Sequence, residues 1–291
     1  MTDHYRIELH DVKFELQEKH EFHWLEELGH VFAVFDQQDS GNISFGVVCG
    51  TEKFFVKYAG AKTVAYSGDV PEAVANLKSA VHLYDELHHP SLITLVNHFS
   101  VGSGYAAIFK WFEGESLHPH WAFPPPEKYT HPDSPYYRFR QLSVEQRLEA
   151  LDSIFSFHEL VARKGFVAVD FYDGSLIYDF EKNKIQICDI DLYQRKSFIN
   201  TMGRLWGSSR FMSPEEFEFG SSIDEKTNVF TMGATAFALL GGELDRSIEK
   251  WEAGEALYKV ALRAVHADRK QRYQSLMEFK KTWDSALNGK I

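Results

Sequence analysis

The sequence predicts an α+β protein in which a strand-rich region precedes a helical one. Three short runs rich in Phe, Val and Ile, each bounded by turn residues, predict an antiparallel meander. After them, apolar residues recur at spacings of three and four, which is typical of helices packed on a core. The three runs are Val31–Phe35, Ile43–Cys49 and Phe54–Tyr58.

Further elements follow in order along the chain. A helix is predicted up to His89-Pro90, because Val74, Leu77, Val81, Tyr84 and Leu87 share one face. Two more strands are predicted at about Ile93–Phe99 and Tyr105–Phe112, and a short strand pair at Ser175–Ile187. Helices are predicted from Val144 through Phe155, at Val229–Leu240 and at Leu276–Leu287.

The segment 118–141 is expected to be a long loop, because it is crowded with His, Pro and aromatic residues. It could form a substrate wall or a protein-docking surface, and its sequence does not decide between them. His118, His120 and His131 are irregularly spaced in it, which favours solvated or partner-facing side chains over a metal site.

Composition excludes several functional classes. With 42 acidic and 31 basic residues, the formal net charge of −11 argues against a nucleic-acid partner. No apolar run approaches the ~18 residues that span a bilayer, and no leader pattern is seen, so we expect a cytoplasmic protein without a membrane partner. Cys49 and Cys188 match no disulfide or metal spacing and are interpreted as reduced core residues.

Three charged residues stand out in apolar surroundings. Lys57 lies in the strand Phe-Phe-Val-Lys-Tyr, while Asp170 and Asp189 each end an apolar run nineteen residues apart. Taken singly, the lysine is most simply a solvated strand residue, and each aspartate a turn or helix cap. Together, in this order, they are the charges that phosphoryl transfer requires: a lysine on phosphates, an aspartate orienting the acceptor hydroxyl, and an aspartate on Mg²⁺.

This set resembles the protein kinase superfamily, as a divergent member of the bacterial eukaryotic-type serine/threonine kinases, over about residues 25–285. The resemblance implies a two-lobed kinase-like fold: a small β-rich N-lobe at residues 1–112, a larger helical C-lobe at 113–291, and a nucleotide cleft between them. It implies a gatekeeper role for Phe109 and adenine contacts near Lys110, Trp111 and Phe112. Glu215 and Arg272 resemble the ion pair that closes the kinase activation segment.

Other positions depart from the kinase pattern. Ala80 stands where the helix glutamate that pairs with Lys57 is expected, and Glu72, two turns earlier, is a poor substitute. Gly41 is the one glycine in the expected phosphate turn, 36–42. Ala168-Val169 replaces His-Arg, so the arginine that would hold a phosphorylated activation segment is missing.

The expected metal site is also altered. Ser175 replaces the asparagine ligand of the second metal, and Asp173 could help it bind Mg²⁺. Tyr172 stands in place of the catalytic-loop lysine. The metal motif reads Asp189-Ile-Asp191 without a glycine, and Asn228 replaces the aspartate that normally anchors the catalytic loop.

Two classes of function therefore stay open. The first is an ATP-dependent phosphotransferase using Mg²⁺ or Mn²⁺, whose acceptor hydroxyl belongs to a protein, which we favour, or to a small molecule. The second is a pseudokinase scaffold that recruits a protein partner. Retention of Lys57, Asp170 and Asp189 favours the enzyme, and the altered helper positions favour the scaffold.

Overall fold

The computed structural model describes residues 4–38 and 40–289. The chain divides into two compact units, one holding residues up to His88 together with Ile93–Phe112, the other His89–Leu92 and all residues after Phe112. The first is rich in β-sheet and the second is mostly helical, so the chain is a mixed α+β protein. The sequence placed one boundary after Phe112. The structure adds His89–Leu92 to the second unit, where Leu92 bridges Ile187.

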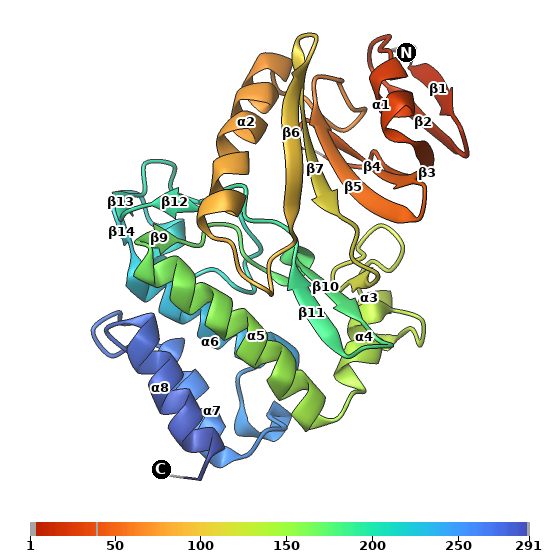
Figure 1. The fold of residues 1–291 in the computed structure, drawn as a ribbon. Coiled ribbons are helices and arrows are strands. Elements are labelled where there is room, and N and C mark those ends of the chain that lie inside the picture. The colour runs from red at the N-terminus through yellow and green to blue at the C-terminus, as the bar shows by residue number, and fades with distance from the viewer. Residues whose placement is uncertain (1–3, 39, 290–291) are drawn as a thin grey trace. The chain divides into compact units, whose positions relative to one another are not determined.

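The first unit is built on a five-stranded antiparallel sheet in the order β3-β4-β5-β7-β6 (Figure 1). Its elements are β1 (Tyr5–Leu9), β2 (Val12–Leu16), α1 (His23–Leu28), β3 (His30–Phe35), β4 (Asn42–Cys49), β5 (Glu52–Ala59), α2 (Val70–Glu86), β6 (Leu95–Val101) and β7 (Gly104–Lys110). The predicted strands and helix are present, with ends shifted by up to a few residues.

The two faces of this sheet are covered differently. Alternation along β4 and β5 places Phe45 and Val56 in a core that also includes the β1–β2 hairpin and Leu25 of α1. The opposite face carries Lys57 and packs against α2. The hairpin and α1 were not predicted from the sequence, although Val12, Phe14 and Leu16 alternate with charged residues as strand residues do.

The second unit surrounds the helix α6 (Figure 1). Its elements are β8 (Glu115–Ser116), α3 (Glu127–Thr130), α4 (Pro135–Arg140), α5 (Val144–Arg163), β9 (Phe166–Val167), η1 (Asp173–Ser175), β10 (Leu176–Asp179), β11 (Lys184–Ile187), β12 (Gln194–Arg195), β13 (Phe198–Ile199), η2 (Pro214–Phe217), β14 (Ser222–Ile223), α6 (Glu225–Leu240), η3 (Ile248–Lys250), α7 (Glu255–Ala264) and α8 (Leu276–Leu287). Every residue of α6 from Thr227 onward is buried, which explains its nearly continuous apolar sequence.

Two expectations from the sequence are wrong. The segment 118–141 is not an open loop, because it contains the short helices α3 and α4, with Pro135 in the first turn of α4 and Tyr136 and Phe139 buried. Neither cysteine forms a disulfide and neither is in the core: Cys49 is exposed and Cys188 is partly exposed. Among the described residues, no helix has the length and apolarity needed to cross a membrane.

A buried ion pair ties η2 to the segment after α7. Arg272 donates from Nη1 to Glu215 Oε1 at 2.7 Å and from Nη2 to Oε2 at 2.9 Å, and both side chains are buried. Burial alone would raise the pKa of Glu215, but the hydrogen bonds and charge of Arg272 outweigh it and lower that pKa. This is the pairing that the resemblance implied. Both side chains also bond to the first turn of α6, since Thr227 donates to Glu215 and Arg272 donates to the Lys226 carbonyl.

Removing one partner of this pair should destabilise the protein strongly, because the other charge would stay buried. We expect Arg272→Met to lower the free energy of unfolding by about 3–5 kcal/mol in denaturant titrations. The double variant Glu215→Gln/Arg272→Met should recover part of that loss. Arg263→Met removes an exposed partner of Glu278 and should cost less than about 1 kcal/mol. Equal losses in the single and double variants would contradict a charge-pair role.

Candidate functional site

Asp170 lies on the turn between β9 and η1, and its backbone is in the left-handed region with φ 62°. Aspartate tolerates this region better than most residues, but the conformation persists only where the surroundings enforce it. Backbone strain of this kind concentrates at functional sites. The residue that the sequence proposed as the catalytic aspartate is therefore held in an uncommon conformation.

The loop that carries Asp170 is anchored from α6. The buried Asn228 accepts a hydrogen bond from the Ala168 N–H at 2.8 Å and donates to the Phe166 carbonyl at 2.9 Å. An amide side chain can satisfy a donor and an acceptor at once, which a carboxylate cannot. Asn228 thus serves the anchoring purpose expected at its position, with different chemistry.

Asp189 follows β11, and the β10–β11 hairpin returns it toward the same loop. The Cys188 N–H donates to the Ser175 carbonyl at 2.9 Å, and the Ser175 hydroxyl donates to the Asp170 carbonyl at 3.5 Å. Ser175 is 1% exposed. These contacts join three of the predicted site residues, Asp170, Ser175 and Asp189, through adjacent backbone.

The pKa shifts of Tyr172 and Tyr193 also indicate that Asp170 and Asp189 lie near each other. Burial raises the pKa of the Tyr172 phenol, and the carboxylates of Asp170 and Asp189 raise it further. The pKa of buried Tyr193 is raised by burial and then by the same two carboxylates. Both aspartates therefore act electrostatically on the same two side chains, and the second unit gathers negative charge around Tyr172.

Asp173, proposed from the sequence as an additional metal ligand, is committed to other partners. Arg210 donates from Nη2 to its Oδ1 at 2.7 Å and from Nη1 to its Oδ2 at 2.8 Å, and Lys128 donates to Oδ2. Burial would raise the pKa of Asp173, but these two cations outweigh it and lower that pKa. With both oxygens bound by cations, Asp173 is a structural anion and a poor metal ligand.

Among the described residues, no group of three or more His, Cys, Asp or Glu side chains forms a metal cage. Mg²⁺ commonly keeps several waters and binds through one or two carboxylates together with substrate phosphates. Asp189 and Asp191 are two residues apart, and the Asp191 N–H donates to Asp189 Oδ1 at 3.2 Å, while the Ser175 hydroxyl donates to the Asp170 carbonyl. This donor set suits a hard cation that arrives with a phosphate ligand.

In the first unit, Lys57 lies on the sheet face that packs against α2, opposite Ser44 on β4 and Ala107 on β7. Lys57 is 8% exposed and Ser44 is fully buried. The Ser44 hydroxyl has no hydrogen-bond partner among the described residues. Ala80, at the position where a glutamate was expected, is buried on α2, and Glu72 is exposed in the first turn of that helix.

Aromatic rings cover the sheet around Lys57. Phe55 contacts Phe109 and Phe35, with ring centroids 6.3 and 5.8 Å away, and Trp111 contacts Phe32 and Phe35 at 5.0 and 6.5 Å. The Trp111 indole N–H is buried without an acceptor in the described structure. This face combines a buried lysine, two polar groups that have no partner among the described residues, and several aromatic rings.

Three other residues predicted to contact the nucleotide, Lys110, Trp111 and Gly41, have roles within the fold of the first unit. The backbone N–H groups of Lys110 and Trp111 already donate to the carbonyls of Thr94 and Lys53, at 2.9 and 3.1 Å, so neither N–H is free to make the expected adenine contact. Gly41 has φ 77°, and a Cβ there would lie 2.7 Å from the Ala73 Cβ. Its lack of a side chain is thus required by packing against α2, with or without a phosphate.

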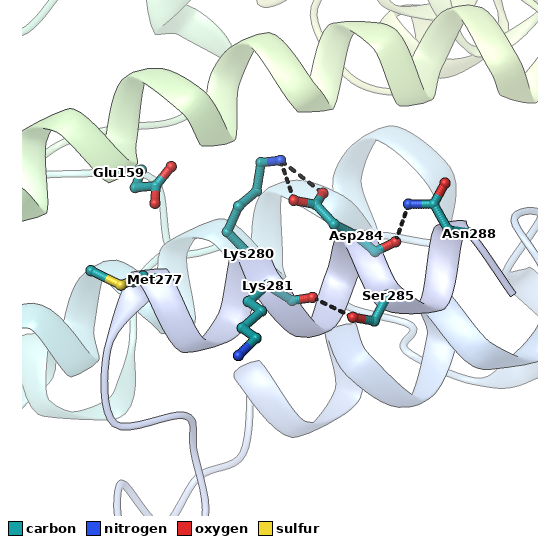
Figure 2. A pocket seen from close by; sticks show the side chains of 7 residues that line it. All are labelled: Glu159, Met277, Lys280, Lys281, Asp284, Ser285 and Asn288. Atoms are coloured by element: carbon teal, nitrogen blue, oxygen red, sulfur yellow. Dashed lines mark hydrogen bonds and ion pairs between the residues drawn. The ribbon is translucent and has the colours of Figure 1, made fainter. Parts of the chain in front are cut away.

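A pocket of about 290 Å³ lies on α8 beside α5 and shares no residue with the predicted site (Figure 2). Several of its polar side chains are bonded to each other or to backbone: Lys280 to Asp284, Ser285 to the Lys281 carbonyl, and Asn288 to the Asp284 carbonyl. The pocket contains none of the residues that the sequence predicted for the site.

Comparison with known proteins does not add an identity. No family model matches the chain, and no curated protein matches it. The assignment therefore depends on the residues and their geometry.

Sequence reasoning missed Lys128 and Arg210 as site residues. They lie 45 residues before and 37 residues after Asp173, in the 118–141 segment and in the run that leads into Ser213-Pro-Glu. Nothing local in either segment shows that these two side chains will be buried against Asp173.

Replacing the anchor Asn228 should loosen the Asp170 loop. We expect Asn228→Ala to lower the free energy of unfolding by about 2–5 kcal/mol, because two buried backbone groups lose their partners. Hydrogen exchange at residues 166–172 should accelerate. Thr235→Val is the control, since the Thr235 hydroxyl donates only to the Thr231 carbonyl within α6. Unchanged exchange in Asn228→Ala would argue against the anchor.

Glu216 makes stability depend on pH. Its carboxylate, 3% exposed, accepts from the Ser213 N–H and hydroxyl, and burial raises its pKa from 4.5 to about 7. The folded state thus holds a proton that the unfolded state releases, so this stabilisation is complete at low pH and is lost between about pH 4.5 and 7.

The glutamine in Glu216→Gln cannot ionise, so the variant should not lose stability through this group as the pH rises. The free energy of unfolding of the variant, minus that of the wild type, should rise by about 3 kcal/mol between pH 4.5 and 8, measured by denaturant titration. Ser209→Ala, at an exposed neighbouring position, is the control. A difference that stays flat across this range would show that Glu216 does not titrate there.

Proposed function

We propose that this chain is an ATP-dependent phosphotransferase, a divergent relative of serine/threonine protein kinases with a kinase-like fold. The observation that carries the proposal is Asp170, held at φ 62° on an anchored loop and joined to Asp189 through Ser175 and Cys188. Uncommon backbone at a carboxylate, next to a second carboxylate, is what positioning an acceptor and a metal–nucleotide requires.

The architecture supports the same assignment. A five-stranded antiparallel sheet with one helix packed on it comes first, and a mostly helical unit comes second. The lysine, the catalytic aspartate and the metal aspartate fall on the elements where kinases carry them: a sheet strand, a loop before a hairpin, and the end of that hairpin. The Glu215–Arg272 pair supports the kinase interpretation of the segment before α6.

The residues fit a nucleotide. Lys57 would bind its phosphates, and the Trp111 indole, which has no acceptor among the described residues, would gain one from it. Asp189, with Asp191 or Ser175, would hold Mg²⁺ or Mn²⁺, which when bound neutralises charge on the phosphates. Asp170 would accept a hydrogen bond from the acceptor hydroxyl, orient it and take up its proton. We assign that hydroxyl to a protein serine or threonine because Ser213-Pro-Glu resembles the peptide-docking end of a kinase segment.

A second candidate is a pseudokinase scaffold, and specific observations favour it. Ala80 gives Lys57 no carboxylate from that position of α2, and Asp173 is bound by Lys128 and Arg210. The rings of Phe55 and Trp111 also occupy the sheet face that a nucleotide base would approach, so a base must stack on them or displace them. Under this hypothesis the chain binds a protein partner and transfers no phosphate.

The deciding experiment combines nucleotide binding and transfer. We expect ATP with Mg²⁺ at about 100 times its Kd to stabilise the protein by about 2.7 kcal/mol, visible as a rise in Tm of several degrees. Asp189→Asn should abolish the Mg²⁺-dependent part of this rise. Asp170→Asn should keep it but lower phosphate transfer to a protein acceptor by about 10²–10⁴-fold.

Asp152→Asn is the matched control, since Asp152 is an exposed carboxylate paired with Lys280, and it should leave both readouts unchanged. A rise in Tm without transfer by the wild type would favour a nucleotide-binding scaffold. No rise at millimolar ATP would overturn the enzyme proposal.

A further inference from the structure

Four charged side chains from distant parts of the second unit form one buried cluster. Asp173 follows β9, Lys128 comes from α3, Arg210 from the segment before η2, and Glu243 from the turn after α6. Arg210 bridges the two acids, donating to Asp173 and to Glu243 Oε1 at 2.6 Å. Asp173 is fully buried, and Lys128 is 1% exposed. We call Lys128, Asp173, Arg210 and Glu243 the buried charge cluster.

The cluster is balanced in charge and closely packed. It contains two acids and two bases, and a buried carboxylate is tolerated only when such partners and hydrogen bonds compensate its lost hydration. The Lys128 ammonium also lies 4.3 Å from the Tyr136 ring centroid, and the Tyr129 hydroxyl donates to Glu243. Burial lowers the pKa of neighbouring His118 to about 4, so His118 adds no charge near neutral pH.

The cluster holds the segment before η2 close to Asp170. Asp173 lies three residues after Asp170, and Arg210 lies three residues after Gly207. A Cβ placed on Gly207 would lie 3.6 Å from the Asp170 Cα. The bidentate Arg210–Asp173 contact therefore spans two backbones that already touch beside the candidate catalytic residue.

In the kinases that this chain resembles, an arginine of the catalytic loop holds a phosphorylated residue of the activation segment. Here Ala168-Val169 replaces His-Arg, and the polarity is reversed: the arginine is on the segment and the anion is on the loop. We propose that Arg210 and Lys128 are positioning residues that fix segment 207–212 against the Asp170 loop without phosphorylation. The effect of these residues on phosphate transfer rests on the function proposed above.

Two consequences distinguish this device from a phosphorylation switch. The anion is a side chain encoded in the chain, so the ordered state needs no second enzyme. The 118–141 segment also becomes part of the site, because α3 supplies one of the two cations on Asp173. This gives that segment a role in holding the loop, which its composition alone could not reveal.

The test uses the full chain and two readouts. Hydrogen exchange is followed in peptides covering 166–175 and 205–212, and phosphate transfer is measured in parallel. We expect Arg210→Met to accelerate exchange in both peptides at least tenfold while α6 stays protected. It should lower kcat about 100-fold, with KM for ATP within threefold of the wild type, because misplaced groups slow chemistry more than binding. Arg210→Lys should restore part of the protection.

Arg204→Met is the matched control, because Arg204 lies three residues before segment 207–212 and, among the described residues, donates to the carbonyls of Leu205 and Gly207 and not to the Asp170 loop. If Arg210→Met is too unstable to purify, the charge-balanced double variant Asp173→Asn/Arg210→Met takes its place and should show the same faster exchange. Wild-type exchange rates in a folded Arg210 variant, or an equal effect from Arg204→Met, would overturn the inference. A wild type without transfer activity would refute the proposed function and leave the exchange result to decide this inference.

Discussion

A carboxylate that is fully removed from water must be neutralised where it lies, and Asp173 is such a carboxylate. Its partners, Lys128 and Arg210, come from segments far from it in sequence, and Arg210 in turn binds Glu243. Satisfying this one group therefore fixes the Asp170 loop, the segment before η2, the helix α3 and the end of α6 together. The position of the Asp170 loop therefore depends on the neutralisation of Asp173.

The buried helix α6 supplies the rigid platform beneath these segments. Asn228 on its first turn holds the loop backbone, and Thr227 donates to Glu215, which is paired with Arg272. A helix that is apolar on all sides can carry a few polar residues only where each finds a partner. Thr227 and Asn228 thus attach the surrounding chain to α6, whereas Thr231 and Thr235 donate to carbonyls within the helix.

The two units present different chemistry. The second gathers carboxylates on constrained backbone, whereas the first offers Lys57 among aromatic rings, with a hydroxyl and an indole that lack partners among the described residues. Anionic oxygens and a planar base would satisfy the first set, and a metal–phosphate would satisfy the second, and these chemistries are the reason that we propose a phosphotransferase.

The sequence by itself predicted the five strands of the first unit's sheet, the helix α2 and the helices α5, α6 and α8, and it singled out Lys57, Asp170 and Asp189, because periodicity and charge in apolar runs are local signals. It did not predict the β1–β2 hairpin, α1 or α7, whose patterns are short, and it mistook α3 and α4 for a loop because proline dominates their neighbourhood. The partners of Asp173 and the strained backbone of Asp170 were decided only by the tertiary structure. Burial and charge neutralisation join residues across long sequence separations, and nothing local in the sequence encodes which of them will meet.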